Sequence, residues 1–257
     1  MIIRRGPSRS SCTIGWDLTN DTFKVGQWVR ARIYERRCDL SPDGRHLIYF
    51  ALNGRWSSKA KGSWTAISRA PYLKAIGLWA NGTAWHGGGL FVSNSVYWIN
   101  DFFPSHEEQL APHSLRATKE FPFHESYGGE CPGVYYIRLQ RDGWTLQKSQ
   151  QKSSSEFHVT FEKKLPKGWV LQKTAHASSR PPRGKGVYHD THRLIHSDKG
   201  TTQDFPDWEW ADFRGNRLYW TTRGVLFKSM VSPKGISFPR QLFDFNPLEF
   251  EDIRAPY

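Results

Sequence analysis

A unit made of a tight turn and a buried strand recurs along this chain, and it limits the possible fold more than any other feature. The segment 44–49 aligns with the segment 215–220, and a weaker copy lies at 94–99. Each copy opens on glycine or asparagine, which adopt the backbone conformations of tight turns, and continues into an apolar run of strand length. Short strands joined by such turns predict an all-β chain.

Two further patterns predict hairpins. Asn20 and Asp21 lie between apolar residues, where their short polar side chains favour a tight reversal. The run Gly-Trp-Thr-Leu-Gln-Lys at 143–148 is echoed by Gly-Trp-Val-Leu-Gln-Lys at 168–173, which is 25 residues later. Because this spacing corresponds to two strands with their connections, we expect Trp144 and Trp169 to occupy equivalent positions.

The turns recur with a period that is typical of one architecture. They fall near residues 43, 93, 142 and 214, at intervals of about 50, 49 and 72 residues. Periods of about 40–50 residues with four short strands each are typical of propeller blades. We therefore predict a single β-propeller-like domain over 1–257, with about five blades of short antiparallel strands, complete or incomplete, and an inserted loop segment at 101–130. A two-sheet sandwich of the same hairpins remains the structural alternative.

Little helix is expected. The segments 106–110 and 115–120 are the stretches that suit short helical turns, because they contain few turn-forming and β-branched residues. The run Val-Tyr-Tyr-Ile at 134–137 predicts a strand instead.

One family resemblance supports the propeller prediction. The segment 39–44, Asp-Leu-Ser-Pro-Asp-Gly, followed by Leu-Ile-Tyr-Phe at 47–50, resembles the blade repeat of TolB-like and WD40-like propellers. The segment 16–18, Trp-Asp-Leu, looks like the Trp-Asp pair that ends a WD40 strand, although no Gly-His partner precedes it. The whole chain also looks similar to a group of bacterial proteins without assigned function. The resemblance implies a propeller and no particular chemistry.

Composition predicts a folded protein without a membrane span. Aromatic residues make up 15% of the 257 residues, and so many large rings bury enough surface to offset the entropy of ordering. No apolar run approaches the length of about 20 residues that a bilayer crossing needs. Cys12, Cys38 and Cys131 are too widely spaced for a disulfide framework or a zinc motif. These features predict a reduced, cytoplasmic protein with no membrane partner.

The charge of the chain suggests a class of partner. There are 36 Lys and Arg against 24 Asp and Glu, a formal net charge of +12. Arginine pairs with carboxylates and phosphates and stacks on rings, so a basic, aromatic surface suits an acidic protein, a peptide or a nucleic acid. Solubility alone is the simpler explanation of such a charge.

Loops at one end of a propeller's strands surround a central depression, and the repeat positions place a set of candidate binding residues on one such rim. They are Arg36, Arg37, Trp85, His86, Trp208, Glu209 and Trp210. Trp208 and Trp210 are two residues apart, so we expect them to face the same side of a strand.

Two other patterns offer chemistry. His86-Gly87-Gly88-Gly89 resembles the oxyanion turn of lipase-like esterases, but the chain has no Gly-x-Ser-x-Gly nucleophile motif. A glycine-rich entry to a buried strand, pressed by bulky neighbours, explains these glycines better. His189, His192 and His196 are weak candidates for a metal site, because a strand would point His189 and His192 to opposite faces.

The sequence therefore predicts a non-catalytic binding module that presents a basic, aromatic-rich rim to a protein or peptide partner. It predicts no cofactor and no metal. Two alternatives remain. A nucleic-acid-binding β protein would show affinity that falls steeply with salt. A hydrolase or lyase, with its active site in the propeller depression, would need a cleft in which a carboxylate or a histidine has a strongly shifted pKa.

Overall fold

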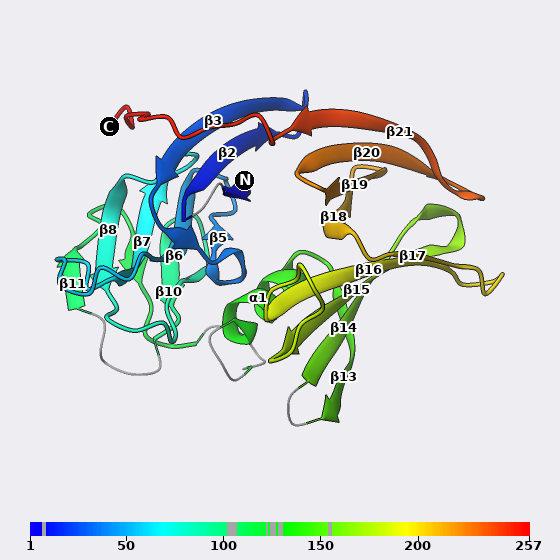
Figure 1. The fold of residues 1–257 in the computed structure, drawn as a ribbon, viewed down its shortest axis with the longest axis horizontal. Coiled ribbons are helices and arrows are strands. Elements are labelled where there is room, and N and C mark those ends of the chain that lie inside the picture. Colours follow the sequence, from blue (N-terminus) through cyan, green and yellow to red (C-terminus); the bar gives the residue numbers. More distant parts are fainter. Residues whose placement is uncertain (7–8, 102–106, 122, 124–126, 128–130, 154–155) are drawn as a thin grey trace. The chain divides into compact units, whose positions relative to one another are not determined.

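The computed structural model describes residues 1–257 except 7–8, 102–106, 122, 124–126, 128–130 and 154–155 (Figure 1). Strands take up 52% of the chain and helix 7%. The all-β prediction is therefore confirmed. The predicted inserted segment 101–130 lies partly outside the described residues.

The chain divides into two compact units. Unit 1 comprises Met1–Arg138 together with Glu249–Tyr257, and unit 2 comprises Leu139–Leu248. The single-domain prediction stays a prediction, because this division does not distinguish two domains from two halves of one.

Unit 1 contains three sheets in its described residues. Its strands are β1 (Ile2–Arg5), β2 (Ser11–Asp17), β3 (Thr22–Val29), β4 (Arg32–Ile33), β5 (Asp39–Leu40), β6 (His46–Leu52), β7 (Ser63–Arg69), β8 (Ala75–Ala80), β9 (Gly89–Phe91), β10 (Val96–Ile99), β11 (Glu107–Leu110) and β12 (Arg116–Ala117). The sheet orders are β1-β2-β3, then β11-β8-β7-β6-β4 with β5 also paired to β6, then β12-β10-β9. The pair β10–β12 is parallel.

The described residues of unit 2 form two antiparallel sheets. Its strands are β13 (Thr145–Ser153), β14 (Glu156–Lys164), β15 (Trp169–Ser178), β16 (Tyr188–His196), β17 (Thr202–Phe205), β18 (Trp208–Arg214), β19 (Arg217–Thr222), β20 (Val225–Ser232) and β21 (Gly235–Asp244). Both sheets follow chain order, β13 to β17 and β18 to β21, so each strand pairs with its sequence neighbour (Figure 1).

The helices differ from the prediction. They are α1 (Pro132–Arg141) and the short 3-10 turns η1 (Glu35–Arg37) and η2 (Pro166–Gly168). The strand predicted at 134–137 is wrong, because this run is the buried centre of α1; a short apolar run fits a buried helix as well as a strand. The predicted helical turns are also wrong, since β11 and β12 occupy the described parts of those segments. None of the helices in the described chain has the length and apolarity for crossing a bilayer.

The predicted hairpins are confirmed where turn chemistry is strong. β2 and β3 meet at Asn20 and Asp21, and Asp21 adopts a positive φ of 55°. The turns that precede β6 and β19 hold Gly44 and Gly215 at φ of 73° and 55°. These values favour glycine, which carries no Cβ to clash.

The 25-residue repeat also has a structural counterpart. Gly143 and Gly168 have positive φ values of 86° and 75°, and each is followed by a tryptophan that is 2% exposed. Trp144 and Trp169 lead into β13 and β15, the two strands that flank β14. Their contacts differ, because Trp144 packs against Lys163 and Lys173 whereas Trp169 donates to Ser232 O and packs against His196, so the equivalence of the two positions stays a prediction.

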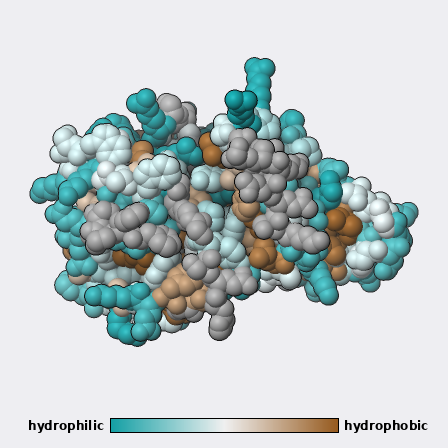
Figure 2. Space-filling model, turned by 90° about the horizontal axis from the view of Figure 1, so that it is seen from below, coloured by the Kyte–Doolittle hydropathy of each residue, from teal (hydrophilic) through white to brown (hydrophobic). Residues whose placement is uncertain are grey.

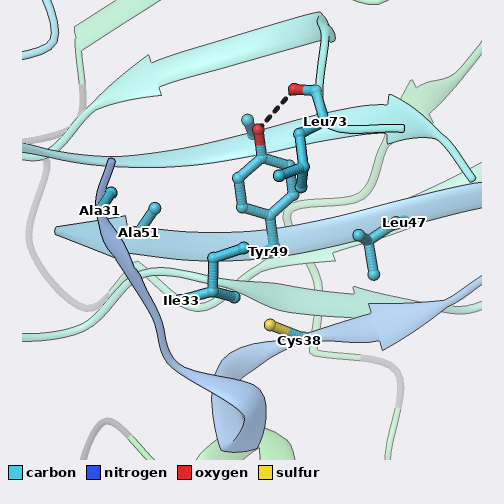
Figure 3. Close-up of a cluster of buried hydrophobic side chains, with 8 residues drawn as sticks. Ala31, Ile33, Cys38, Leu47, Tyr49, Ala51 and Leu73 are labelled. Atoms are coloured by element: carbon cyan, nitrogen blue, oxygen red, sulfur yellow. Dashed lines mark hydrogen bonds between the residues drawn. The ribbon is translucent and has the colours of Figure 1, made fainter. Parts of the chain in front are cut away.

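One part of the core of unit 1 lies beside β6, as Figure 3 shows. Leu47, Tyr49 and Ala51 alternate along this strand and point to one side, where they meet Ile33 and Cys38. The hydroxyl of Tyr49 donates a hydrogen bond of 2.7 Å to the carbonyl oxygen of a buried leucine, Leu73. All three cysteines, Cys12, Cys38 and Cys131, are buried, and none of them forms a disulfide.

Candidate binding site

The structure corrects the prediction that Arg36 and Arg37 lie on an exposed rim. Both belong to η1, and they are only 6% and 2% exposed. The guanidinium of Arg36 lies 4.7 Å from the ring centre of Tyr135. Guanidinium groups stack on aromatic rings and bond carbonyl oxygens when they leave water, so burial here gives these arginines structural contacts rather than a partner surface.

Arg37 holds the turn that follows β8. Its Nη1 donates hydrogen bonds to the carbonyl oxygens of Ala84, at 2.8 Å, and His86, at 2.7 Å. Its guanidinium also lies 4.8 Å from the ring centre of Tyr34 and 4.7 Å from that of Phe50. Two carbonyls on either side of Trp85 are thus tied to one buried cation, which fixes the backbone that carries this tryptophan.

The glycines after His86 allow the backbone to pass very close to its neighbours. A Cβ on Gly88 would lie 1.9 Å from the carbonyl oxygen of Arg37, and a Cβ on Gly87 would lie 2.4 Å from the ring of Phe50. The expectation of a glycine-rich entry pressed by bulky neighbours is confirmed. The N–H of Gly87 donates to Asn100 O at 2.8 Å and that of Gly88 to Thr65 Oγ1 at 2.9 Å. These two donors are therefore already engaged within the fold and do not form an oxyanion hole.

Among the predicted rim residues of unit 1, Trp85 is the one that the structure exposes. Its side chain is 66% exposed, while His86 beside it is partly buried. The side-chain amide of Asn81 donates to Trp85 O at 2.8 Å, and the N–H of Trp85 donates to Thr83 Oγ1 at 3.1 Å. The large ring of Trp85 is thus exposed to solvent, while hydrogen bonds fix the position of its backbone.

A second exposed tryptophan, which the sequence analysis did not select, lies on the neighbouring loop. Trp56 is 53% exposed and sits on the segment 53–62 between β6 and β7. The hydroxyl of Ser63, at the end of this loop, donates to Thr83 O at 2.6 Å, so the two loops lie side by side. We call 53–62 and 81–86 the tryptophan loops. The Asn-Gly turn at 53–54, close before Trp56, is the sequence signal that could have revealed this position.

The third predicted group, at 208–210, lies in unit 2 and is described there by itself. Trp208 is 5% exposed and stacks on Phe205 and Trp220, with ring centres 3.9 Å and 5.1 Å away. Trp210 is 36% exposed and Glu209 is exposed. The expectation that both tryptophans face one side is wrong, because a β-bulge between them shifts the register of β18.

The histidines considered for a metal lie on β16 and do not converge. Alternation along the strand places His189 on one face and His192 and His196 on the other, where both are buried. In the described part of the chain no three His, Cys, Asp or Glu side chains are grouped so that they could hold a metal ion.

His192 has an unusual electrostatic environment. Its ring is 2% exposed, lies 6.2 Å from the ring of Trp208, and has no hydrogen-bond partner for either nitrogen among the described residues. Burial, helped by the nearby cation of Lys173, lowers the pKa of His192 to about 3, against smaller opposing effects of Asp190 and the Trp208 backbone. A ring with this pKa, on the closed face of its strand, is neutral at physiological pH and is a poor general acid or base.

Comparisons with known proteins add no relationship. No family model, no curated protein and no solved structure matches this chain.

Proposed function

We propose that the protein is a non-catalytic binding module, and that the tryptophan loops of unit 1 form its contact surface for an acidic protein or peptide partner. The single observation that carries the proposal is the exposure of Trp56 and Trp85, at 53% and 66%, on adjacent loops. Tryptophan and arginine dominate binding hot spots, because a rigid ring buries much area and loses little conformational entropy.

The tryptophan loops are also preorganised, which lowers the cost of binding. Arg37, Asn81 and Thr83 hold the backbone of Trp85, while Ser63 ties the two loops together. On the face in Figure 2, apolar patches are separated by hydrophilic surface. Recognition through a few anchored rings does not require a broad apolar interface.

The charge of the loops favours an acidic partner. Arg55, Lys59 and Lys61 are exposed on the loop that carries Trp56. Lys61 forms an ion pair with Glu107, whereas Arg55 and Lys59 have no ion-pair partner among the described residues. Two cations beside two rings can pair with carboxylates while the rings bury apolar side chains of a peptide.

The propeller arrangement and the TolB-like and WD40-like resemblance are part of the same proposal. What supports them is that the three copies of the turn-and-strand unit enter three different sheets, through β6, β10 and β19. Three buried cysteines without a disulfide suit a reducing compartment, and we therefore place the protein in the cytoplasm. Cell fractionation tests this location.

Substitution of the exposed rings tests the proposal. We expect a peptide-display selection against the immobilised protein to enrich acidic peptides that contain apolar residues. Trp56→Ala and Trp85→Ala should each weaken binding of a selected peptide by tenfold or more, because truncating a hot-spot ring costs about 2 kcal/mol or more. Fluorescence anisotropy measures the affinity, and Trp210→Ala in unit 2 is the matched control.

Nucleic acid is tested in the same assay. A fluorescent single strand and a duplex are titrated at two salt concentrations. If the oligonucleotides bind more tightly than every selected peptide, and Trp85→Ala removes that binding, the partner class is nucleic acid and the peptide proposal fails. Peptide binding that survives both tryptophan substitutions would also contradict it.

The orientation of Trp56 gives a second prediction. Gly62 has a φ of 76°, and a Cβ there would lie 2.4 Å from the Trp56 ring. Gly62→Ala should therefore displace this ring and weaken peptide binding about as much as Trp56→Ala does. Gly54→Ala is the control, because it has a similar φ of 72° in the same loop and no atom within 4 Å of its Cβ. Equal affinities for the two glycine variants would show that the ring position does not matter.

A further inference from the structure

The β14–β17 sheet of unit 2 carries an ordered set of polar side chains on one face. Residues two apart on a strand share a face, and the pairing register lines them up across strands. His158 on β14 is opposite His176 on β15, which is opposite His189 on β16. Thr160, Thr174 and Thr191 form the next row in the same way.

A third row follows the threonines. Glu162 is opposite Gln172, Gln172 is opposite Arg193, and Arg193 is opposite Asp204 on β17. These residues are already paired, since Gln172 Nε2 donates to Glu162 Oε1 at 2.9 Å and Arg193 Nε lies 2.6 Å from Asp204 Oδ1. We call the three rows the polar array.

The histidine row is closely spaced and held in place. The rings of His176 and His189 stack with centres 4.6 Å apart and an interplanar angle of 7°, and the rings of His158 and His176 are 5.9 Å apart. Nε2 of His176 shares a hydrogen bond of 2.9 Å with Thr191 Oγ1, and Nδ1 of His189 donates to Gly186 O at 3.0 Å. The stacked rings of His176 and His189 cover each other's faces, so each of them has at most one ring face left for a ligand to stack on.

Most of the polar array, all but His189 and Glu162, lines a hollow of about 670 Å³. This volume is within the range of about 300–1,000 Å³ that small-ligand sites have. The threonines of the middle row are partly buried, as expected for side chains that line a hollow. His192 also borders the hollow, but its ring lies on the opposite face of β16, against Trp208. The hollow is therefore lined by hydroxyl, imidazole and amide groups with one Arg–Asp pair.

We propose that the polar array is a binding site for a neutral carbohydrate, such as a short oligosaccharide. The hydroxyl of threonine and the amide of Gln172 each donate and accept hydrogen bonds, and each imidazole offers ring nitrogens for hydrogen bonding. Sugar hydroxyls also do both, whereas carboxylates and phosphates only accept. A lining whose groups do both therefore matches a polyhydroxylated ligand best.

Charge complementarity supports an uncharged ligand. Arg193 is neutralised by Asp204 within hydrogen-bonding distance, so the lining has no cation left to attract a phosphate or sulfate. Lys185, at the edge of the hollow, already donates to Pro206 O at 2.9 Å. The site is independent of the tryptophan loops, which lie in unit 1.

A glycan array of neutral and sulfated oligosaccharides, followed by calorimetric titration of the best neutral ligand, tests this site. We expect the full chain to bind neutral glycans with little dependence on salt. The double variant Thr174→Val/Thr191→Val keeps side-chain shape and removes two hydroxyls, and it should weaken binding at least tenfold. Thr202→Val, an exposed position on β17 outside the hollow, should bind as the wild type does.

Three results would overturn the proposal. They are the absence of binding to every neutral glycan, binding of sulfated glycans alone with steep salt dependence, and equal affinities for the double variant and the wild type. Thermal unfolding of the double variant shows whether it is folded, and His158→Ala provides a second change in the array if it is not. Trp56→Ala and Trp85→Ala should leave glycan binding unchanged, so this test and the peptide test fail separately.

Discussion

Replacing Gly88 by alanine is expected to prevent stable folding of unit 1. The new Cβ would lie 1.9 Å from the carbonyl oxygen of Arg37 and 2.8 Å from its carbon, and the φ of Gly88 is 77°. The clashing atoms are backbone, and Arg37 is anchored by its own bonds to Ala84 and His86, so neither side of the contact can give way. We expect a loss of at least about 4 kcal/mol in unfolding free energy, the range of the most disruptive single substitutions.

Gly82→Ala is the matched control for this prediction. Gly82 lies six residues earlier with a similar φ of 71°, but its Cβ would meet only the flexible side chain of Lys61 at 3.8 Å. It should cost about 1–2 kcal/mol, the strain of a left-handed backbone alone. Urea unfolding followed by circular dichroism compares the two variants. Similar midpoints would mean that the turn relaxes freely and that Arg37 does not fix it.

Local turn chemistry explains which parts of the fold could be predicted. Gly44 and Gly215 indicate turns, because few other residues tolerate positive φ. The apolar run after each glycine indicates a strand with a buried face. Such signals act over a few residues and do not depend on distant parts of the chain. For the same reason they say nothing about how separate sheets are arranged, so the radial stacking of blades stays a prediction.

The elements that were predicted wrongly depend on tertiary contacts. In α1, Val134, Tyr135, Tyr136 and Ile137 are all at most 5% exposed, so no polar residue within the run reveals the helical period. The bulge that separates Trp208 from Trp210 arises from pairing with β19, which cannot be read from β18 alone. The burial of Arg36 and Arg37 was not predicted either, because charged side chains usually lie on the protein surface.

The candidate sites were predictable to different degrees. Trp85 was selected from its repeat position, and the structure exposes it. Arg37 was selected for a contact with a partner and instead holds the turn. The polar array could not be foreseen, because histidines at 158, 176 and 189 have no common spacing in the sequence. Only the pairing register of β14, β15 and β16 places them in one row.

The second large effect is expected on acidification. The pKa of His192 is about 3 in the folded protein, below the ordinary histidine value of 6.5 that applies to the unfolded chain. The unfolded chain therefore takes up a proton as the pH falls through 6.5, and the folded protein does not until the pH approaches 3. Stability from this group is complete above pH 6.5 and decreases as the pH falls toward 3, by about 1.4 kcal/mol for each pH unit.

His192→Phe should remove this acid sensitivity, because phenylalanine keeps a planar ring beside Trp208 and does not titrate. Between pH 6.5 and pH 4 the wild type should lose on the order of 3 kcal/mol more unfolding free energy than the variant does. Urea unfolding at several pH values measures the difference, with the exposed His113→Phe as control. Parallel pH profiles for wild type and His192→Phe would mean that the imidazole accepts its proton within the fold. The cation of Lys173 and the shielding of the ring from water would then be too weak to keep the ring neutral.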